Sequence, residues 1–429
     1  MIGGRLGARR WASRLAGVLA AAALLGCGAG SGGRSVGSAT GGGGSSPAAL
    51  GGLDFASIAQ GEQSGITSPR EELITDPIAF DAVWNQHTNN TSPAPRFNFH
   101  DYAIVGIFLG ARPSPGYAVE VVRVALDAAR TELHVTVREF APGSWRRRVA
   151  VPTAPFDIVS IPRPPAGAKL VVHHQRRLDF EVLHEGAHSN IGAGDPAYQG
   201  ELLAFGDLLS FDAFWQRHTS DPIPAVDFSQ EMVVAVLGGY FPDAGHRVAT
   251  HRLIDDPQRG VVRVDYAIER QVGGAPPPQQ SETPFQILRV SRAWRPVRAE
   301  QRVDLSIEEL DSGQQAAYQG AQPAVEVVRD AQGYDALYAG YIGTPPLQPL
   351  DPATQQAVFA MLGVQPSGGY SIRLARAQLL EDGELELWIE TSRPTGPAAS
   401  VLTSPYQVAR LARTWGPVSF QLVDVTPRP

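Results

Sequence analysis

Four short landmarks recur three times in the same order along this chain, and a repeat of this kind decides the architecture before any single residue does. The landmarks are an extended opening segment, an aromatic segment with helical spacing, a Pro–Gly turn and a closing strand. The opening segments begin at Leu53, Leu178 and Val303, 125 residues apart both times. A length of 429 residues also leaves room for about three domains. The repeats therefore predict three repeat domains: 53–177, 178–302 and 303–429.

Each copy predicts one amphipathic helix beside several strands. In the first copy Asp76 is a favourable N-cap and Pro77 suits the first helical position. Asp207 and Asp330 occupy the same place in the other copies. The apolar face of the first helix comprises Phe80, Val83, Trp84 and His87. With hairpin-forming strands around this helix, the predicted fold class is α+β: three tandem, mostly antiparallel β domains, each with one covering helix.

The first fifty residues predict a lipoprotein signal peptide and a stalk. Residues 1–26 carry four arginines and no acid, and their apolar run is too short to span a bilayer. The run ends in Leu-Leu-Gly-Cys, which is typical of a bacterial lipobox, so Cys27 is the predicted lipid attachment site. An ordinary signal peptide with an incidental cysteine is the alternative. Residues 27–52 are rich in Gly and Ser and predict a flexible stalk, and Gly28 favours sorting to the outer membrane.

The composition excludes several classes of function. A single cysteine rules out an intramolecular disulfide and cysteine-based metal sites. The formal net charge is −7, and removal of the four leader arginines would make it −11, which argues against nucleic acid as a partner. Lys169 is the one lysine beside 35 arginines. No cofactor is predicted.

The three Pro–Gly turns are the predicted partner-binding elements. Proline fixes φ, glycine permits positive φ, and an aromatic residue at the tip offers rigid contact area. The alternative is a structural turn whose aromatic side chain packs on the neighbouring strand. The candidate residues are Pro113, Gly116 and Tyr117 in copy one, Pro242, Gly245 and His246 in copy two, and Pro366, Gly368, Gly369 and Tyr370 in copy three.

One segment matches the H-E-x-x-H pattern of zinc peptidases: His184, Glu185 and His188. That pattern binds zinc from a helix, whereas here it follows a predicted strand and precedes a Gly-rich turn. The equivalent positions of copy one hold no ligands. The sequence therefore predicts no catalytic residues and no metal site, and a metallopeptidase is the weakest alternative.

Two other groups of charged or titratable residues have simple explanations. His87 and His218 share one helix position, and a tyrosine there in copy three favours a place at the edge of the core over a role as ligand or base. Three consecutive arginines, 146–148, form a basic patch on an acidic chain. A solvated loop is the favoured interpretation of this patch, and an anion site is the alternative.

The third copy resembles the PrcB C-terminal domain family, named for a lipoprotein subunit of a spirochaete surface protease complex. The resemblance rests on an apolar strand (358–363), the Pro-Ser-Gly-Gly-Tyr-Ser-Ile turn (366–372), an extended Trp-Ile-Glu strand (388–390) and a closing Pro-Tyr strand (405–408). The other two copies follow the same pattern, with Pro115, Ala244 and His246 as departures in their turns.

The resemblance implies a non-enzymatic accessory role and brings no catalytic residues. The predicted function is a multivalent protein-interaction module, lipid-anchored in the bacterial cell envelope, whose partner is an envelope protein such as a protease. A protease inhibitor that inserts its loops into a partner is the alternative.

Overall fold

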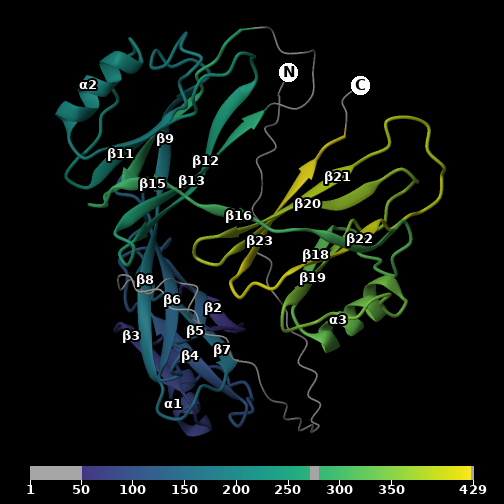
Figure 1. The fold of residues 1–429 in the computed structure, drawn as a ribbon. Coiled ribbons are helices and arrows are strands. Elements are labelled where there is room, and N and C mark those ends of the chain that lie inside the picture. Colours follow the sequence, from purple (N-terminus) through teal and green to yellow (C-terminus); the bar gives the residue numbers. More distant parts are fainter. Residues whose placement is uncertain (1–50, 271–279, 427–429) are drawn as a thin grey trace, which may run out of the picture.

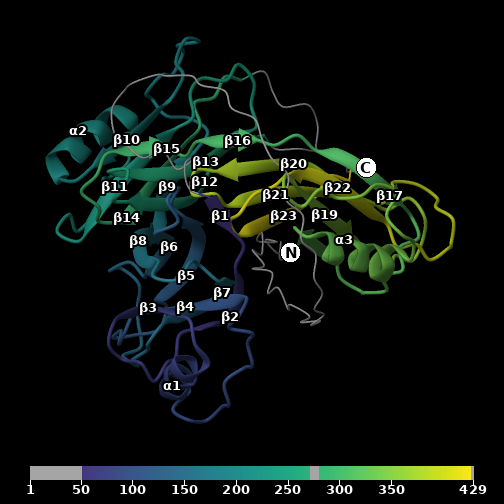
Figure 2. The ribbon, with the colours of Figure 1, turned by 60° about the horizontal axis from the view of Figure 1, so that its bottom comes forward.

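The structure is a computed structural model that describes residues 51–270 and 280–426. The predicted signal peptide, Cys27 and all but the last two stalk residues lie outside this part of the chain. Figures 1 and 2 show three units that meet at the centre of the molecule, with the helices α1, α2 and α3 at its outer ends. Within the described residues, no helix has the length and apolar character needed to cross a membrane. We call residues 53–177, 178–302 and 303–429 units 1, 2 and 3.

The elements recur from unit to unit in nearly the same order. Unit 1 is preceded by β1 (Gly51–Leu53) and comprises β2 (Ala56–Gly61), β3 (Arg70–Ile74), α1 (Pro77–Thr88), β4 (Tyr102–Phe108), β5 (Ala118–Leu126), β6 (Glu132–Ala141), β7 (Phe156–Pro162) and β8 (Lys169–Leu178). Unit 2 comprises β9 (Phe180–Gly186), β10 (Glu201–Phe205), α2 (Leu208–His218), β11 (Glu231–Leu237), β12 (His246–Asp256), β13 (Val261–Arg270), β14 (Phe285–Ser291) and β15 (Val297–Ala299). Unit 3 comprises β16 (Arg302–Asp304), β17 (Glu308–Gly313), β18 (Ala324–Val328), α3 (Ala331–Leu337), the π-helical turn η2 (Tyr338–Ile342), β19 (Gln355–Met361), β20 (Ser371–Leu380), β21 (Leu385–Ser392), β22 (Tyr406–Ala412) and β23 (Val418–Asp424).

The predicted α+β class, with three tandem domains each covered by one helix, is wrong. The structure is mostly β, with 46% strand and 10% helix. Each unit stacks two sheets, and the helix covers only the outer one, as in the order β2-β7-β4-β3 of unit 1. The units are also not separate sheets in tandem, because one seven-stranded sheet, β1-β5-β6-β8-β12-β13-β15, runs through units 1 and 2.

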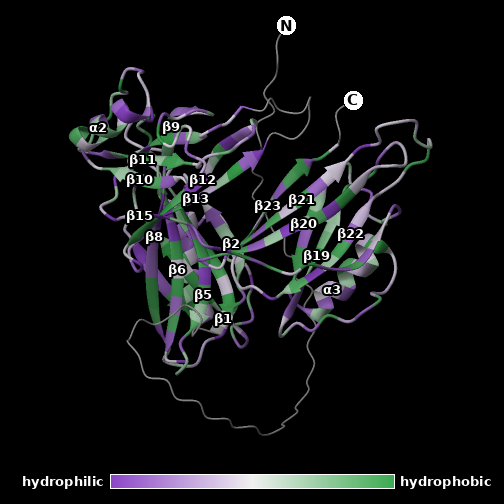
Figure 3. Ribbon diagram, turned by 45° about the horizontal axis from the view of Figure 1, so that its top comes forward, coloured by the Kyte–Doolittle hydropathy of each residue, from purple (hydrophilic) through white to green (hydrophobic). Residues whose placement is uncertain are grey.

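The apolar strand β4 explains why two sheets form. Its alternate residues Val105 and Ile107 face the inner sheet, whereas Ile104 and Phe108 face α1. A continuous apolar run indicates burial on both faces of a strand, and this run extends over β4 without a polar interruption. Figure 3 shows hydrophobic residues gathered along the strands in all three units.

Parallel strands link the units. In each unit the last inner strand lies parallel to its neighbour: β8 beside β6, β15 beside β13, and β23 beside β21. The end of β8 then pairs antiparallel with β12 of unit 2, which joins two inner sheets into one. At the next junction two non-strand residues separate β15 from β16, and the two strands belong to different sheets, so the inner sheet of unit 3 is separate.

The predicted helix starts are confirmed. The carboxylates of Asp76, Asp207 and Asp330 each accept a hydrogen bond from the backbone N–H three residues on. The predicted apolar face of α1 is buried, His87 included. The Glu-Asp-Gly-Glu sequence at 381–384 is typical of a hairpin turn, and it joins β20 to β21 with Gly383 at φ +89°.

Candidate functional site

Each unit presents one tip, built from two loops. One loop is the Pro–Gly turn that precedes β5, β12 or β20. The other loop, called the covering loop, leads to β7, β14 or β22. A backbone bridge joins the two loops in every unit: Arg112 with Thr153, Phe241 with Glu282, and Gln365 with Thr403. In units 1 and 3 the threonine hydroxyl also donates to a carbonyl of the turn, at 3.0 and 2.8 Å. The turns are therefore fixed by the loop that covers them.

The turn glycines have the backbone conformation that the sequence predicted. Gly116, Gly245 and Gly369 lie at φ +94°, +102° and +85°, where other residues are strained. A Cβ atom on Gly369 would come within 3.0 Å of Pro394 in the covering loop. Gly368 has open space around the position of a Cβ atom.

The aromatic side chains of the turns are held by the protein. Tyr117 lies between the Arg112 and Arg148 guanidinium groups, 5.9 and 6.0 Å from its ring. The His246 side chain is 10% exposed and stacks on Phe241, with 4.1 Å between ring centroids.

Tyr370 is half-buried and packs against the core between the two sheets of unit 3. Binding through these rings stays a prediction, and their packing favours the structural interpretation of all three. Pro113, Pro242, Pro366 and Gly369 are exposed, and the other predicted residues are partly buried.

The tip of unit 1 is docked onto unit 2. Arg146 donates two hydrogen bonds to the Asp179 carboxylate, at 2.8 and 2.9 Å, and the Gly143 N–H donates a third at 2.9 Å. Ser144 donates to Glu231 at 2.7 Å. Burial alone would raise the pKa of Asp179, but these donors hold it below its ordinary value. The loop after β6 is therefore a protein-docking element within this chain.

The tip of unit 3 has the same two loops but no such contact. Among the described residues, every hydrogen bond and ion pair of residues 366–370 and 393–404 stays within unit 3. Val401 and Leu402 are 57% and 66% exposed. This tip lies at the end of unit 3 that points away from the other two units (Figure 1).

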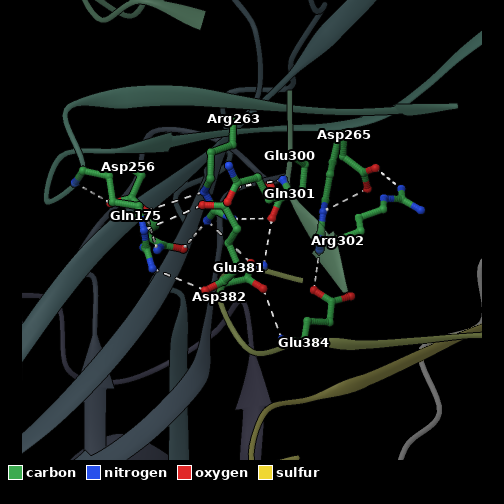
Figure 4. A network of polar contacts seen from close by, with 12 residues as sticks. Gln175, Asp256, Arg263, Asp265, Glu300, Gln301, Arg302, Glu381, Asp382 and Glu384 are labelled. Carbon is green, nitrogen blue, oxygen red and sulfur yellow. Dashed lines mark hydrogen bonds and ion pairs between the residues drawn. The ribbon is translucent and has the colours of Figure 1, made fainter. Parts of the chain in front are cut away.

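The opposite end of unit 3 is locked into the centre of the molecule, where the β20–β21 hairpin inserts Glu381, Asp382 and Glu384 among arginines of the other units (Figure 4). Asp382 lies 2.5 Å from Arg138 of unit 1 and 3.6 Å from Arg263 of unit 2. Glu384 pairs with Arg138 and with Arg252. Burial alone would raise the pKa of Asp382, but the surrounding guanidinium groups hold it well below its ordinary value.

The ion network at the centre was not predicted from the sequence, because its partners lie up to 246 residues apart. A signal was nevertheless present in the almost exclusive use of arginine, which suits buried, multiply bonded ion pairs better than lysine. A further ion pair between Asp54 and Arg413 joins the start of unit 1 to unit 3. The three units thus contact one another pairwise, and the tip of unit 3 is held at a fixed distance from the centre.

The structure does not assemble the H-E-x-x-H segment as a zinc site. His184 and Glu185 lie on β9, which extends further into the segment than the sequence predicted, and His188 forms an isolated β-bridge with Thr283. The two histidines therefore lack the helical i, i+4 spacing that directs both side chains of this motif to one metal ion. His184 instead contacts His218 at 3.2 Å, and Glu185 accepts from Gln286 at 2.9 Å. No group of three potential ligands comes together within residues 51–270 and 280–426.

The buried histidines have a structural role. The His218 ring contacts the Ser189 hydroxyl at 2.9 Å, and His87 contacts Ser64 in the same way at 3.0 Å. In both units the serine hydroxyl also accepts the N–H of the isoleucine two residues on. Burial, and then the nearby His184, lowers the pKa of His218 to about 4. Each His–Ser pair therefore fixes the turn beneath its helix, and His218 does so as a neutral imidazole.

Two segments of the chain match the family model described as PrcB C-terminal: 103–162 and 357–412. They run from β4 to β7 in unit 1 and from β19 to β22 in unit 3, so each contains one complete tip. The resemblance to this family is supported for these two copies, whereas the expected third match in unit 2 is not found. No curated protein and no solved structure matches the chain.

Proposed function

We propose that this protein is a non-enzymatic accessory subunit of a protease complex in the bacterial cell envelope, and that it docks its partner through the tip of unit 3. One observation carries the proposal: two equivalent tips differ in their contacts. Unit 1 uses its tip to hold unit 2, whereas the tip of unit 3 exposes Val401 and Leu402 and makes no polar contact outside its own unit among the described residues. Both tips lie in segments that match the PrcB C-terminal model, which supports an accessory role.

The surface chemistry at this tip supports a protein partner. Val401 and Leu402 are adjacent exposed aliphatic residues on a loop that contains no charged residue between 394 and 405, and the Gln365–Thr403 bridge holds this loop against the Pro–Gly turn. Loops held by backbone bridges lose little conformational entropy on binding, so even a small apolar contact yields affinity.

A double variant at the tip tests this proposal. We expect Val401→Ser with Leu402→Ser to reduce recovery of a peptidase from detergent-solubilised envelopes at least tenfold, because the apolar contact is lost. The matched control is Leu347→Ser, a 74% exposed leucine between η2 and β19. Equal recovery with both variants would contradict the proposal. Loss of peptidase activity on addition of purified protein would identify an inhibitor instead.

Lipid attachment at Cys27 is part of the same proposal. Cys27 is the one thiol of the chain and ends a short apolar run. Cys27→Ser should move the protein from the membrane fraction to the soluble fraction, because the acidic chain has little affinity for anionic headgroups. Flotation of the variant in a density gradient checks this, and a variant that still floats with membranes would show a different tether.

A further inference from the structure

A hollow of about 430 Å³ lies on the outer side of the unit 1 tip, next to the junction with unit 2. Its lining combines apolar side chains with three consecutive guanidinium groups and one carboxylate. The lining residues are Pro115, Phe140, Pro142, Arg146, Arg147, Arg148, Val149 and Asp179. Pro115 belongs to the Pro–Gly turn, so both loops of the tip contribute walls.

The charges of this hollow do not cancel. Arg146 is neutralised by Asp179, the single acid of the lining. Arg148 donates to the carbonyls of Pro142 and Gly143 and to the Tyr117 hydroxyl, none of which carries a negative charge. Arg147 is exposed and has no hydrogen bond or ion pair with any described residue. The hollow therefore holds a net positive charge on a chain whose formal charge is −7.

We propose that this hollow binds a carboxylate side chain in an acidic segment of a partner protein. The proposal rests on the interaction role inferred above but uses a second surface. A planar guanidinium group pairs with a carboxylate through two parallel hydrogen bonds, and Arg147 is free to do so. Pro115, Phe140 and Val149 supply apolar walls for the methylene groups and neighbouring residues of a peptide.

A phosphate group fits this hollow less well than a carboxylate on a peptide. Phosphate sites commonly use backbone N–H groups, and here the N–H groups of Gly143 and Arg146 already donate to Asp179 and to the Gly143 carbonyl. Val149 is 72% exposed and Val151 48% exposed beside the arginines, so the rim is apolar. Because an anionic lipid combines a charged headgroup with apolar chains, an anionic membrane surface is the competing outcome of the experiment below.

The equivalent loop of unit 3 provides an internal comparison. Pro142 and Pro394 occupy the same place, since each lies against the turn glycine of its unit. Between Pro394 and Pro405 the unit 3 loop has no arginine, lysine or histidine. The cationic hollow of unit 1 thus has no counterpart in this loop of unit 3, and the two tips are suited to different chemical features of a partner.

Fluorescence anisotropy with two labelled peptides tests the proposal on the purified protein. One peptide alternates Glu with Leu and Val, and the other replaces each Glu by Gln. We expect saturable binding of the acidic peptide that weakens as salt rises, and at least tenfold weaker binding of the neutral peptide. Arg147→Glu should reduce affinity for the acidic peptide at least tenfold, whereas Arg393→Glu at the unit 3 loop should leave it unchanged.

Several outcomes would overturn the proposal. These are equal binding of the two peptides, no saturable binding, or equal losses in Arg147→Glu and Arg393→Glu. Binding to vesicles of anionic phospholipid without binding to the acidic peptide would assign the hollow to a membrane surface. Thermal unfolding checks that Arg147→Glu remains folded, as its exposure leads us to expect. The Val401/Leu402 double variant should bind the acidic peptide normally, so failure here and failure of the proposed function are distinguishable.

Discussion

Asp382→Ala should lower the free energy of unfolding by about 3–5 kcal/mol, because the variant leaves buried guanidinium groups without their central acid. Asp382 is fully buried and lies 2.5 Å from Arg138 and 3.6 Å from Arg263. Arg263 is also fully buried, so water does not replace the lost carboxylate. Differential scanning calorimetry of the purified protein measures the change.

The control for Asp382→Ala is an exposed ion pair of the same unit. Asp424 pairs with Arg393 at 3.3 Å, and their side chains are 46% and 70% exposed. Asp424→Ala should therefore change stability by less than about 1 kcal/mol. A loss of similar size in the two variants would mean that the central network does not hold the units together.

The protein should lose stability as the pH falls from about 6.5 to 4, and His218 should account for about 3 kcal/mol of that loss. Burial, and then the neighbouring His184, lowers the pKa of His218 from 6.5 to about 4. Between these pH values His218 is protonated in the unfolded chain but neutral in the folded protein. The stabilisation from neutral His218 is thus complete above pH 6.5 and declines toward pH 4.

His218→Asn tests this assignment, because asparagine does not titrate. Its unfolding free energy should be lower than that of the wild type at pH 7 but should fall less between pH 6.5 and 4. His100, whose side chain is 91% exposed, provides the control: His100→Asn should keep the pH profile of the wild type. An unchanged slope in His218→Asn would refute the assignment. Chemical denaturation at several pH values gives both quantities.

The local elements of the fold could be predicted from the sequence, whereas its layers could not. Asp76 and Pro77 identify a helix start, and the turn at 381–384 identifies a hairpin, because these signals act within a few residues. The strand β8 pairs in parallel with β6, where Lys169 and Glu132 are 37 residues apart, and antiparallel with β12, where Arg176 and Asp255 are 79 residues apart. Such pairings leave no local pattern, so the sheet shared by units 1 and 2 was missed.

The sequence predicted the local parts of the candidate site, but not the contacts between distant segments. The turns and their positive-φ glycines follow from residue type, since only glycine takes that conformation freely. The direction of the aromatic rings depends on what packs beside them, and Tyr117 lies between Arg112 of its own turn and Arg148 of the covering loop. The docking of the unit 1 loop on Asp179 is likewise a contact between units.

Site-specific photo-crosslinking in intact cells tests the docking role of unit 3 most directly. A benzophenone amino acid at position 402 should give one dominant adduct with an envelope peptidase, because Leu402 is 66% exposed on the free tip. The same amino acid at position 347 should give no such adduct. No adduct at 402, or the same adducts at both positions, would contradict the account that the tip of unit 3 holds the partner.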